Sequence, residues 1–392
     1  MSLKKVSHNF FSSFLERENG VPKFYESISY ADLDKEIYRD EKPYKDETSS
    51  PALLEVTYVP NYLKTTLKKD TNFKTVKHQL VKGYAIDLTH IEEVDSYVKL
   101  KFKKNAKNIR RSIKRLETSF PIKYHLYHGN ITKEEYDRLF DSLLTMIKKR
   151  FKQRNETSKQ LAQWNETLNA TYGLIKQNRA SIFVIYNANE PIEISVNYHR
   201  DKIFYSAISS FDIDYFKFGL GHVEIYKQLI WCFENDYHYF DMGWGDLEYK
   251  NRWCNKTYLF EQFLLYEKKS LIGKLVSSIT NTKVRTKNYL ISKNVHLHVK
   301  NLKKTVRRYL NASQEPISFS FHDLSNETIL PKKAVNLQNT KNTFIRRMVY
   351  DFLYTNLEHV DDIKVYQNFN SDREYYILGK KVSKICKVDF KK

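Results

Sequence analysis

Short apolar runs alternate with polar turns between residues 180 and 242, and this pattern predicts an antiparallel meander that leads into one helix. The runs read as strands are Ser181–Tyr186, Ile192–Tyr198 and Lys202–Ser206. From Leu220 to Phe233 apolar residues recur at the spacing of one helical face, and Tyr237–Met242 is the next strand candidate. The predicted order of three strands, a helix and a strand places a helix N-terminus beside two strand ends.

A basic helix is predicted over residues 99–116, upstream of the meander. Nine Lys or Arg residues lie between Lys99 and Arg115. The apolar residues of this segment step by four, three, four and three positions, at Phe102, Ala106, Ile109, Ile113 and Leu116. Such spacing gives the helix one apolar seam and a cationic outer face. That face is either a solvated helix surface or a docking face for an anionic substrate, tRNA or a membrane.

The flanking regions carry fewer elements. Strands are predicted at Leu53–Val59 and Tyr84–Leu88, a second basic helical region at Lys283–Arg308, a helix at Thr343–Leu357, and a hairpin formed by Ile363–Phe369 and Glu374–Leu378. The chain of 392 residues exceeds the size at which one core stays single, so we expect more than one domain.

Charge and cysteine content narrow the class of protein. The net charge of +20 favours polyanionic partners such as nucleic acid, anionic lipid headgroups or acidic sugars. Cys232, Cys254 and Cys386 have no metal-ligand spacing, which argues against a disulfide scaffold and against bound zinc, so no metal is expected. No apolar run is long enough for a membrane span or a signal peptide core. These features predict a cytoplasmic protein, with peripheral membrane contact as an open alternative, and no stable protein partner is implied.

The first of two glycine pairs opens the predicted helix. Gly219 and Gly221 lie in the segment Phe218-Gly219-Leu220-Gly221-His222. The N-terminus of a helix has free backbone N–H groups and a partial positive charge, and small residues there let an anion approach the backbone. The segment therefore predicts a diphosphate site, although the same glycines also suit a simple tight turn. It is not the dinucleotide fingerprint, because a third glycine is missing.

The second pair, Gly243 and Gly245, follows the last strand of the meander. If a helical turn begins after Gly245, then Asp246, Tyr249 and Lys250 stand at positions i, i+3 and i+4 on one face. A carboxylate, a phenol and an ammonium would then converge at a strand end. Each also has an ordinary interpretation: Asp246 as a helix N-cap, Tyr249 as a packing residue and Lys250 as a solvated cation.

The second pair also carries a family resemblance. Phe240, Asp241, Gly243, Gly245, Asp246, Tyr249 and Lys250 match the Phe-Asp-x-Gly-x-Gly-Asp-x-x-Tyr-Lys signature of the CelD/BcsL branch of the GNAT acyltransferase superfamily. Leu100–Leu116 is similar to the basic helix that precedes this domain in the family, and Leu139–Phe151 resembles the helix that follows it. The resemblance covers residues 84–268.

The resemblance implies an α+β GNAT fold with a mixed twisted sheet that splays between two strands. An acyl-CoA donor, acetyl-CoA or a longer homologue, would place its diphosphate on Phe218, Gly219, Leu220, Gly221 and His222. The common GNAT loop begins with Gln or Arg three residues before its first glycine, and this chain has Phe216 there, followed by Lys217. The related FemAB-type transferases share the fold but take their acyl group from aminoacyl-tRNA, so both donors stay open.

The chemistry implied is direct attack of an amine or hydroxyl on the acyl group, without a covalent enzyme intermediate. Asp246 is expected to orient or deprotonate the acceptor, Tyr249 to donate a proton or contact the acceptor, and Lys250 to stabilise charge. The acceptor expected is anionic or contains a sugar, as in a cell-surface polysaccharide precursor. A third alternative is a polyanion- or RNA-binding protein that keeps the fold without catalysis.

Five segments are expected. They are an N-terminal tail (1–22), a degenerate GNAT-like half with the basic helix 99–116 (23–123), a GNAT acyltransferase domain (124–268), a basic helical segment (269–311), and a connector with a small C-terminal α+β extension (312–392). Asp241 is expected to hold its turn by hydrogen bonds.

Overall fold

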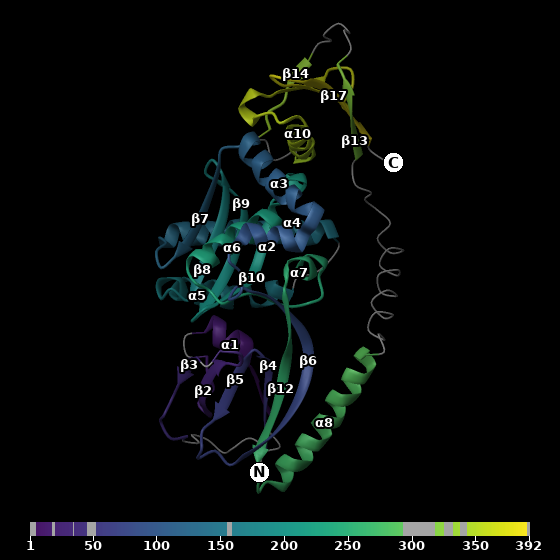
Figure 1. Ribbon diagram of the computed structural model, residues 1–392. Coiled ribbons are helices and arrows are strands. Elements are labelled where there is room, and N and C mark those ends of the chain that lie inside the picture. Colours follow the sequence, from purple (N-terminus) through teal and green to yellow (C-terminus); the bar gives the residue numbers. More distant parts are fainter. Residues whose placement is uncertain are drawn as a thin grey trace.

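The computed structural model describes residues 5–17, 20–33, 35–44, 52–154, 159–292, 318–324, 332–337 and 343–389. A nine-stranded mixed sheet with strand order β1-β4-β12-β6-β11-β10-β9-β8-β7 runs through the molecule (Figure 1). A three-stranded sheet (β3-β2-β5) lies at the lower end of Figure 1, and a five-stranded sheet (β13-β17-β16-β15-β14) lies at the top. The architecture is therefore α+β, as the sequence predicts.

The predicted meander is confirmed. It consists of β8 (Ala180–Asn187), β9 (Glu190–Arg200) and β10 (Ile203–Phe211), which pair antiparallel in sequence order, and β7 (Ile122–His128) adds an edge strand. The predicted helix is α6 (Leu220–Glu234), and β11 (Tyr239–Trp244) returns parallel to β10. Helix α6 is therefore a crossover connection between two parallel strands.

Strands from the N-terminal part complete the same sheet. They are β1 (Lys5–Asn9), β4 (Leu53–Pro60) and β6 (Phe73–Asp87), and β12 (Lys256–Glu267) lies between β4 and β6. The expected boundary between residues 123 and 124 thus crosses a continuous hydrogen-bonded sheet. The smaller sheet consists of β2 (Tyr25–Tyr30), β3 (Glu36–Arg39) and β5 (Leu63–Leu67).

Helices cover both faces of the upper part of the nine-stranded sheet (Figure 1). One face buries α1 (Phe10–Glu16), α4 (Lys133–Arg154) and α5 (Trp164–Lys176) against apolar residues such as Ile194 and Val196. The other face buries α2 (Val94–Phe102), α3 (Ala106–Ser119) and α6 against residues such as Phe204 and Phe240. Strand β9 is consequently buried on both faces.

The expected N-terminal tail is wrong over the residues that the structure describes. Strand β1 pairs parallel with β4, and α1 buries Phe10, Phe11, Phe14 and Leu15 in the main core. Burial of four large apolar side chains within six residues offsets much of the chain entropy that the segment loses on ordering. The run that is too short for a signal peptide is therefore a core helix.

The single basic helix predicted over residues 99–116 is also wrong, because it is two helices. Helix α2 ends at Phe102, Lys103 has a positive φ of 49°, and a short 3-10 turn (Lys103–Asn105) leads into α3. Phe102 packs on Trp253, with ring centroids 4.7 Å apart, whereas Leu116 packs in the cluster formed with the C-terminal part. The two ends of the predicted seam therefore serve different cores, which requires the break.

The C-terminal part confirms the predicted helix and hairpin. Helix α10 (Thr343–Asn356) packs on a sheet built from β13 (Ser318–Asp323), β14 (Lys332–Ala334), β15 (Lys364–Asn368), β16 (Glu374–Leu378) and β17 (Ser383–Asp389). Helix α8 (Leu271–Ser292) follows β12 and lies along the lower strands (Figure 1). The predicted basic helical pattern of residues 293–308 lies outside the described residues.

Candidate active site

Strands β10 and β11 separate where the predicted site lies. They pair at Ile203, Phe204 and Tyr205 only, although β10 continues to Phe211 and β11 to Trp244. The register of β10 against β9 also shifts between Ser206 and Ile208, which marks a bulge at the point of separation. The sheet therefore splays between two parallel strands, as the resemblance implies.

The N-terminus of α6 faces the same region. Gly219 has φ of 64° in the left-handed region and caps the helix, while Phe218 and Leu220 are buried and fix the turn in the core. His222 and Val223 donate their N–H groups to the Gly219 carbonyl. The N–H groups of Leu220 and Gly221 are thus the donors of the first turn without a helical partner in this described segment.

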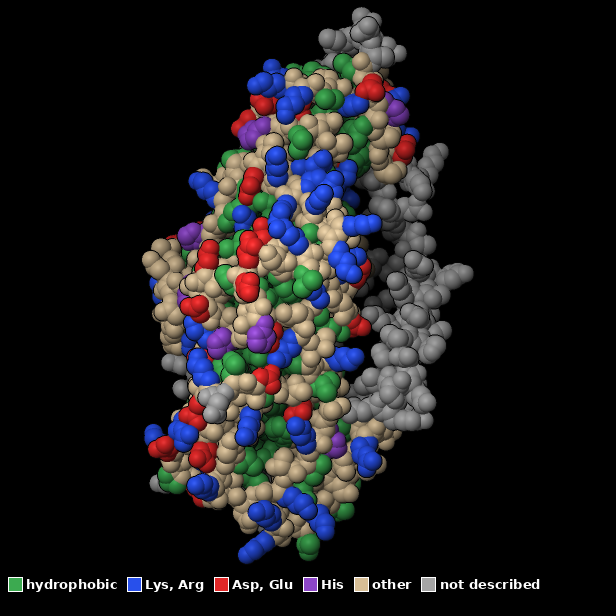
Figure 2. Space-filling view, in the orientation of Figure 1, with side chains coloured by type: hydrophobic (Ala, Val, Ile, Leu, Met, Phe, Trp, Pro, Cys, Tyr) green, Lys and Arg blue, Asp and Glu red, His purple; other side chains and the backbone are tan. Residues whose placement is uncertain are grey.

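The surroundings of this turn fit a diphosphate. The first turn of α6 carries no acidic residue, and the nearest atom to a side chain added at Gly219 would be Ser112 Oγ of α3, at 3.7 Å. Helix α3 presents Lys107, Arg110, Arg111 and Lys114, and Figure 2 shows Lys and Arg side chains gathered around it. His222 differs from the prediction, because its Nδ1 accepts the indole N–H of Trp253 at 3.0 Å and burial lowers its pKa. It therefore orders α7 (Glu248–Trp253) against α6.

The second glycine pair forms a turn that is stabilised by the buried side chain of Asp241. Asp241 is fully buried and accepts hydrogen bonds from Tyr62 Oη at 2.6 Å, from Tyr258 Oη at 2.7 Å and from the N–H of Gly243 at 2.6 Å. Burial raises the pKa of Asp241 to about 6. The structural role predicted for Asp241 is confirmed.

Lys250 belongs to the same turn. Its Nζ donates to the carbonyls of Met242 and Trp244, each at 2.6 Å, and burial lowers its pKa to about 8. Gly243 and Gly245 have φ of 68° and 101°, so the carbonyls of the residues before them, Met242 and Trp244, can point inward at Lys250. The predicted residues do not share one helical face, because α7 begins at Glu248 rather than after Gly245.

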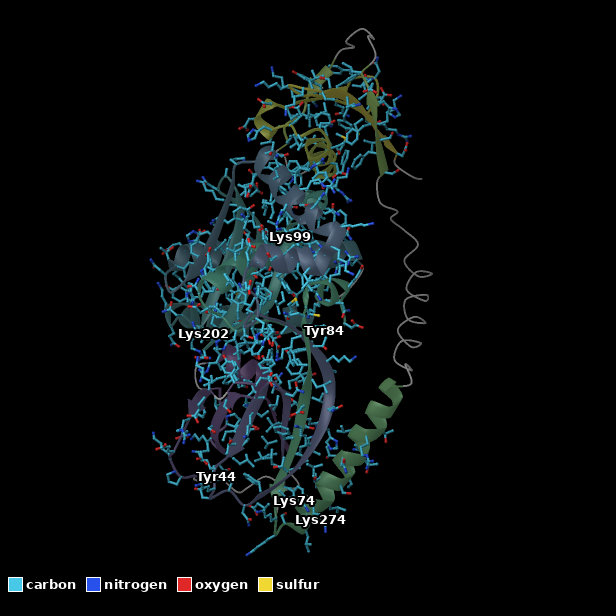
Figure 3. The ribbon with its side chains drawn as sticks, in the orientation of Figure 1. Tyr44, Lys74, Tyr84, Lys99, Lys202 and Lys274 are labelled. Carbon is cyan, nitrogen blue, oxygen red and sulfur yellow. The ribbon has the colours of Figure 1, made fainter. Side chains whose placement is uncertain are left out.

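Asp246 and Tyr249 point to different surroundings. Asp246 is exposed and accepts from Tyr84 Oη at 3.1 Å and Asn251 Nδ2 at 2.6 Å, and these bonds lower its pKa. Figure 3 labels Tyr84 where the upper helices meet the lower strands. Tyr249 is half-exposed, and burial followed by the negative charge of Glu224 raises its pKa to about 12. Of the three predicted residues, Tyr249 is the one whose pKa responds to the charges of Glu224 and Arg150.

A buried pair of glutamates lies under the splayed part of β10. Glu193 of β9 and Glu224 of α6 are 0% and 3% exposed, and Ser209 Oγ of β10 contacts both, at 3.4 Å from Glu193 Oε1 and 2.7 Å from Glu224 Oε2. Burial, followed by the like charge of Glu224, raises the pKa of Glu193 well above its ordinary value. Burial raises the pKa of Glu224 to about 6. At neutral pH one carboxyl of the pair therefore holds a proton while the other can accept one.

Side chains at the mouth of the splay connect this pair to solvent. Ser209 is partly exposed, so its hydroxyl links the buried carboxylates to the opening. The guanidinium of Arg150, from the end of α4, lies 4.5 Å from the ring centroid of Phe211, and its charge acts on Glu224 and Tyr249. Gly221 leaves room for the Phe211 ring, whose edge would be 4.0 Å from an added side chain. The turn at Gly219 and Gly221, which we call the donor turn after its expected diphosphate, thus lies near the same separated strand ends as the glutamate pair and Tyr249.

Four of these residues were missed by the sequence analysis: Arg150, Glu193, Ser209 and Glu224. Strand β9 carries polar residues at alternate positions, at Glu193, Ser195, Asn197 and His199, and all four are buried. Alternation of this kind in an otherwise apolar strand is a signal for a polar stripe. Only the position of β9 inside the sheet shows that the stripe is covered by α6 rather than by water.

A pocket of about 500 Å³ lies beside Phe211, which forms part of its lining. Its lining consists of Asp141, Ser142, Thr145, Met146, Lys149, Glu190, Pro191, Phe211, Asp212, Ile213 and Arg346. The pocket shares Phe211 with the splay, and its lining combines apolar surface with charged side chains such as Asp141, Lys149 and Glu190, which suits a molecule with polar groups. It is the candidate acceptor pocket.

Helix α10 holds the segment that leads into the donor turn. Arg346 donates to Asp214 Oδ2 at 2.6 Å and to Asp212 Oδ2 at 2.8 Å, and Lys217 pairs with Asp351 at 3.2 Å. Burial, and then the neighbouring Asp212 carboxylate, raises the pKa of Asp214, so these carboxylates depend on the cation. The C-terminal part is therefore attached to the 3-10 helix Ile213–Phe218 that precedes Gly219.

Substitution of Arg346 by Met should loosen the donor turn. It leaves Asp212 and Asp214 without their cation, and we expect a loss of about 2 kcal/mol of unfolding free energy, since the site is partly open to water. Hydrogen exchange of the amides of residues 212–221 should become faster, while exchange in β8 stays unchanged. The matched control is Arg373→Met in the turn between β15 and β16, which should leave the donor turn unaffected. Unchanged exchange in R346M would contradict the attachment.

The remaining expectations concern disulfides, a bound metal ion and a membrane-spanning helix. The three cysteines are free and buried. Within the described residues there is no group of three His, Cys, Asp or Glu side chains placed to hold a metal ion. In that same part of the chain, no helix is long and apolar enough to cross a bilayer.

Comparison with known proteins identifies one domain family. Residues 103–251 match the model of the acetyltransferase (GNAT) domain. No curated protein matches the chain. This matched span contains the meander, the splay, the donor turn and the turn at Gly243 and Gly245.

The solved structures that resemble part of this chain include three with low sequence identity to it. FemX is 10% identical with a TM-score of 0.39, over 58% of this chain and 74% of its own. A conserved protein of unknown function from Bacteroides thetaiotaomicron is 11% identical with a TM-score of 0.37, over 55% and 70% of the two chains. The C-terminal DUF2156 domain of an Agrobacterium fabrum protein proposed to be a lysylphosphatidylglycerol synthetase is 11% identical with a TM-score of 0.36, over 58% and 71%.

The family match and the splayed sheet agree in position, since the splay and the helix that crosses over it lie within residues 103–251. Residues 103–251 are therefore similar to a GNAT acetyltransferase domain, and the architecture in which they lie is α+β with a mixed, splayed sheet.

Proposed function

We propose that this protein is an acyltransferase that moves an acetyl or other acyl group from acyl-CoA to an amine or hydroxyl of a sugar-containing or anionic acceptor. A cell-surface polysaccharide precursor, as expected for the CelD/BcsL branch, is the acceptor class that the signature from Phe240 to Lys250 favours. The observation that carries the proposal is the separation of β10 from β11 after Tyr205, with the first-turn N–H groups of α6 and the Ser209–Glu224 hydrogen bond close to the separated strand ends.

The chain's residues divide the chemistry among them. The first-turn N–H groups of Leu220 and Gly221 bind the donor diphosphate. The acceptor atom forms a bond to the acyl carbon, the bond from that carbon to sulfur breaks, and the acceptor proton passes by way of the Ser209 hydroxyl to the Glu224 carboxylate. Tyr249 donates a proton to the leaving thiolate or contacts the acceptor.

The remaining signature residues have supporting roles. Lys250 already donates to two carbonyls, which supports a positioning role rather than the direct charge stabilisation expected from the sequence. Asp246 is exposed and fixed by Tyr84 and Asn251, which supports contact with the acceptor. His222 holds the indole of Trp253 and positions α7.

Donor binding tests the proposal directly. Titration calorimetry should show binding of acetyl-CoA and of free CoA, and Gly221→Val should weaken it by about tenfold or more, because a branched side chain covers the first-turn N–H groups. Gly173→Ala in α5 is the matched control, since nothing lies within 4 Å of the added carbon. Equal affinity in wild type and G221V would contradict the donor site.

A FemAB-like, aminoacyl-tRNA-dependent transfer is the second candidate. The observation that favours it is the basic helix α3 beside the donor turn, with Ser112 closest to Gly219. Consumption of aminoacyl-tRNA without any binding of CoA would replace acyl-CoA as donor. Salt-dependent RNA binding without acyl transfer would instead support a polyanion-binding protein that has kept only the fold.

A further inference from the structure

Helix α8 places its large apolar residues on the outside. Leu271, Leu275 and Ile279 are 82%, 62% and 50% exposed, and Ile272 is 36% exposed. Leu271, Leu275 and Ile279 stand at positions i, i+4 and i+8, and Ile272 stands at i+1. The four side chains therefore form one continuous stripe along the first three turns of the helix. We call Leu271, Ile272, Leu275 and Ile279 the α8 stripe.

The opposite face of α8 is the one that packs on the protein. Gly273 and Ser277 are buried, and Val276 packs with Leu53 and Leu264 of the lower strands. A side chain at Gly273 would meet the carbonyl of Ala52 at 2.8 Å, so small residues are required on this face. The helix is thus attached through its small residues, while its leucines and isoleucines are left in water. Such an exposed apolar row in a folded protein marks an interaction surface.

The charged residues of α8 are all positive. Helix α8 contains no Asp or Glu between Leu271 and Ser292. On a helical wheel, Lys274 and Arg285 lie along one side of the stripe and Lys283 along the other, and all three are exposed. Burial, followed by the positive charge of Arg285, lowers the pKa of His78 on β6, so Arg285 lies near that strand.

The neighbouring strand adds to the same surface. Lys74 of β6 and Lys274 of α8 are labelled at the same lower end of the molecule in Figure 3. Figure 2 shows blue side chains gathered at that end. The α8 stripe begins beside Lys274 at this end of the helix. The lower end of the molecule therefore carries apolar and cationic groups together.

We propose that α8 is a membrane-surface helix that lies in the headgroup region of an anionic bilayer, with the α8 stripe inserted among the acyl chains. The combination of an apolar stripe and flanking cations matches the two parts of such a bilayer, hydrocarbon and phosphate. Nucleic acid matches only the cations, because leucine and isoleucine gain nothing from a phosphate backbone. The binding would bring the GNAT-like part of the chain to a membrane surface through a helix that lies on the bilayer.

Vesicle sedimentation tests the proposal with the full chain. The wild type should bind vesicles of phosphatidylcholine and phosphatidylglycerol, and bind vesicles of phosphatidylcholine alone about tenfold or more weakly. The triple variant Leu271→Ser, Leu275→Ser, Ile279→Ser should lose about tenfold or more of the affinity for the mixed vesicles, because three inserted side chains are removed. Lys274→Gln with Lys283→Gln should remove part of the preference for phosphatidylglycerol.

A matched control is Phe369→Ser, which removes another exposed apolar residue, 64% exposed, from the C-terminal part. It should bind the mixed vesicles as the wild type does. Equal binding by the wild type and the triple variant would overturn the proposal, as would a wild-type dimer that binds no vesicles and dissociates in the triple variant. None of these measurements uses acyl transfer, so failure of the proposed enzymatic function leaves this test intact.

Discussion

Replacing Glu224 by Gln should lower kcat by about 10²-fold or more, because the proposed transfer loses the only carboxylate of the pair that can accept a proton near neutral pH. Glutamine keeps the size of the side chain and can still hydrogen-bond Ser209, so the affinity for CoA should change little. Single-turnover kinetics and calorimetry on the same variant separate these two quantities. Glu234→Gln, on the exposed end of α6, is the matched control and should be fully active.

The pH dependence of the rate in E224Q provides a second test of the role of Glu224. Burial raises the pKa of Glu224 to about 6 from an ordinary value of 4.5, so the wild-type rate should rise as the pH increases through about 6 and the carboxylate forms. In E224Q this rise should be absent. The contribution of Glu224 to the free energy of unfolding changes with pH in the opposite direction to the rate. Because the pKa of this carboxyl is raised in the folded protein, its contribution is fully present below pH 4.5 and is lost as the pH rises through about 6. E224Q should therefore be no less stable than the wild type at pH 8. A variant that is both inactive and unstable at that pH would indicate a structural role instead.

Replacing Asp241 by Leu should lower the unfolding free energy by about 4 kcal/mol or more, since it leaves several buried donors without an acceptor. Those donors are the hydroxyls of Tyr62 and Tyr258 and the N–H of Gly243. Tyr62 belongs to the β4–β5 connection, Gly243 to β11 and Tyr258 to β12, so the carboxylate joins two strands and the β4–β5 connection. Denaturant unfolding followed by tryptophan fluorescence measures the loss.

Tyr62→Phe is the graded control for this prediction. It removes one of the hydrogen bonds and keeps the ring in place, so a loss of about 1 kcal/mol is expected. If D241L were no less stable than Y62F, the buried carboxylate would not hold the turn. The turn also fixes Lys250 and the start of α7, so D241L should lose transfer activity even at temperatures where it is folded.

The sequence predicted the parts of the site that depend on local spacing. The strands of the meander, helix α6 and the glycine turns follow from periodicity and from residues that tolerate positive φ, and each is formed by neighbours in the chain. The prediction for Asp246, Tyr249 and Lys250 was less accurate, because it assumed that the helix begins directly after Gly245. Lys250 was assigned to the wrong environment for that reason, since the inward-facing carbonyls of Met242 and Trp244 cannot be read from spacing.

What the sequence determined by itself is the order of elements from the meander to β11, the tight turn at Gly219 and Gly221, and the signature from Phe240 to Lys250. The tertiary structure alone decided that Glu193 and Glu224 meet under Ser209, that the basic segment breaks at Lys103, and that α8 turns its leucines outward. Each of these depends on which strand or core a residue reaches after chain segments far apart in sequence have packed. Burial, which also sets the pKa of Glu224, is a property of that packing, and no local pattern of residues specifies it.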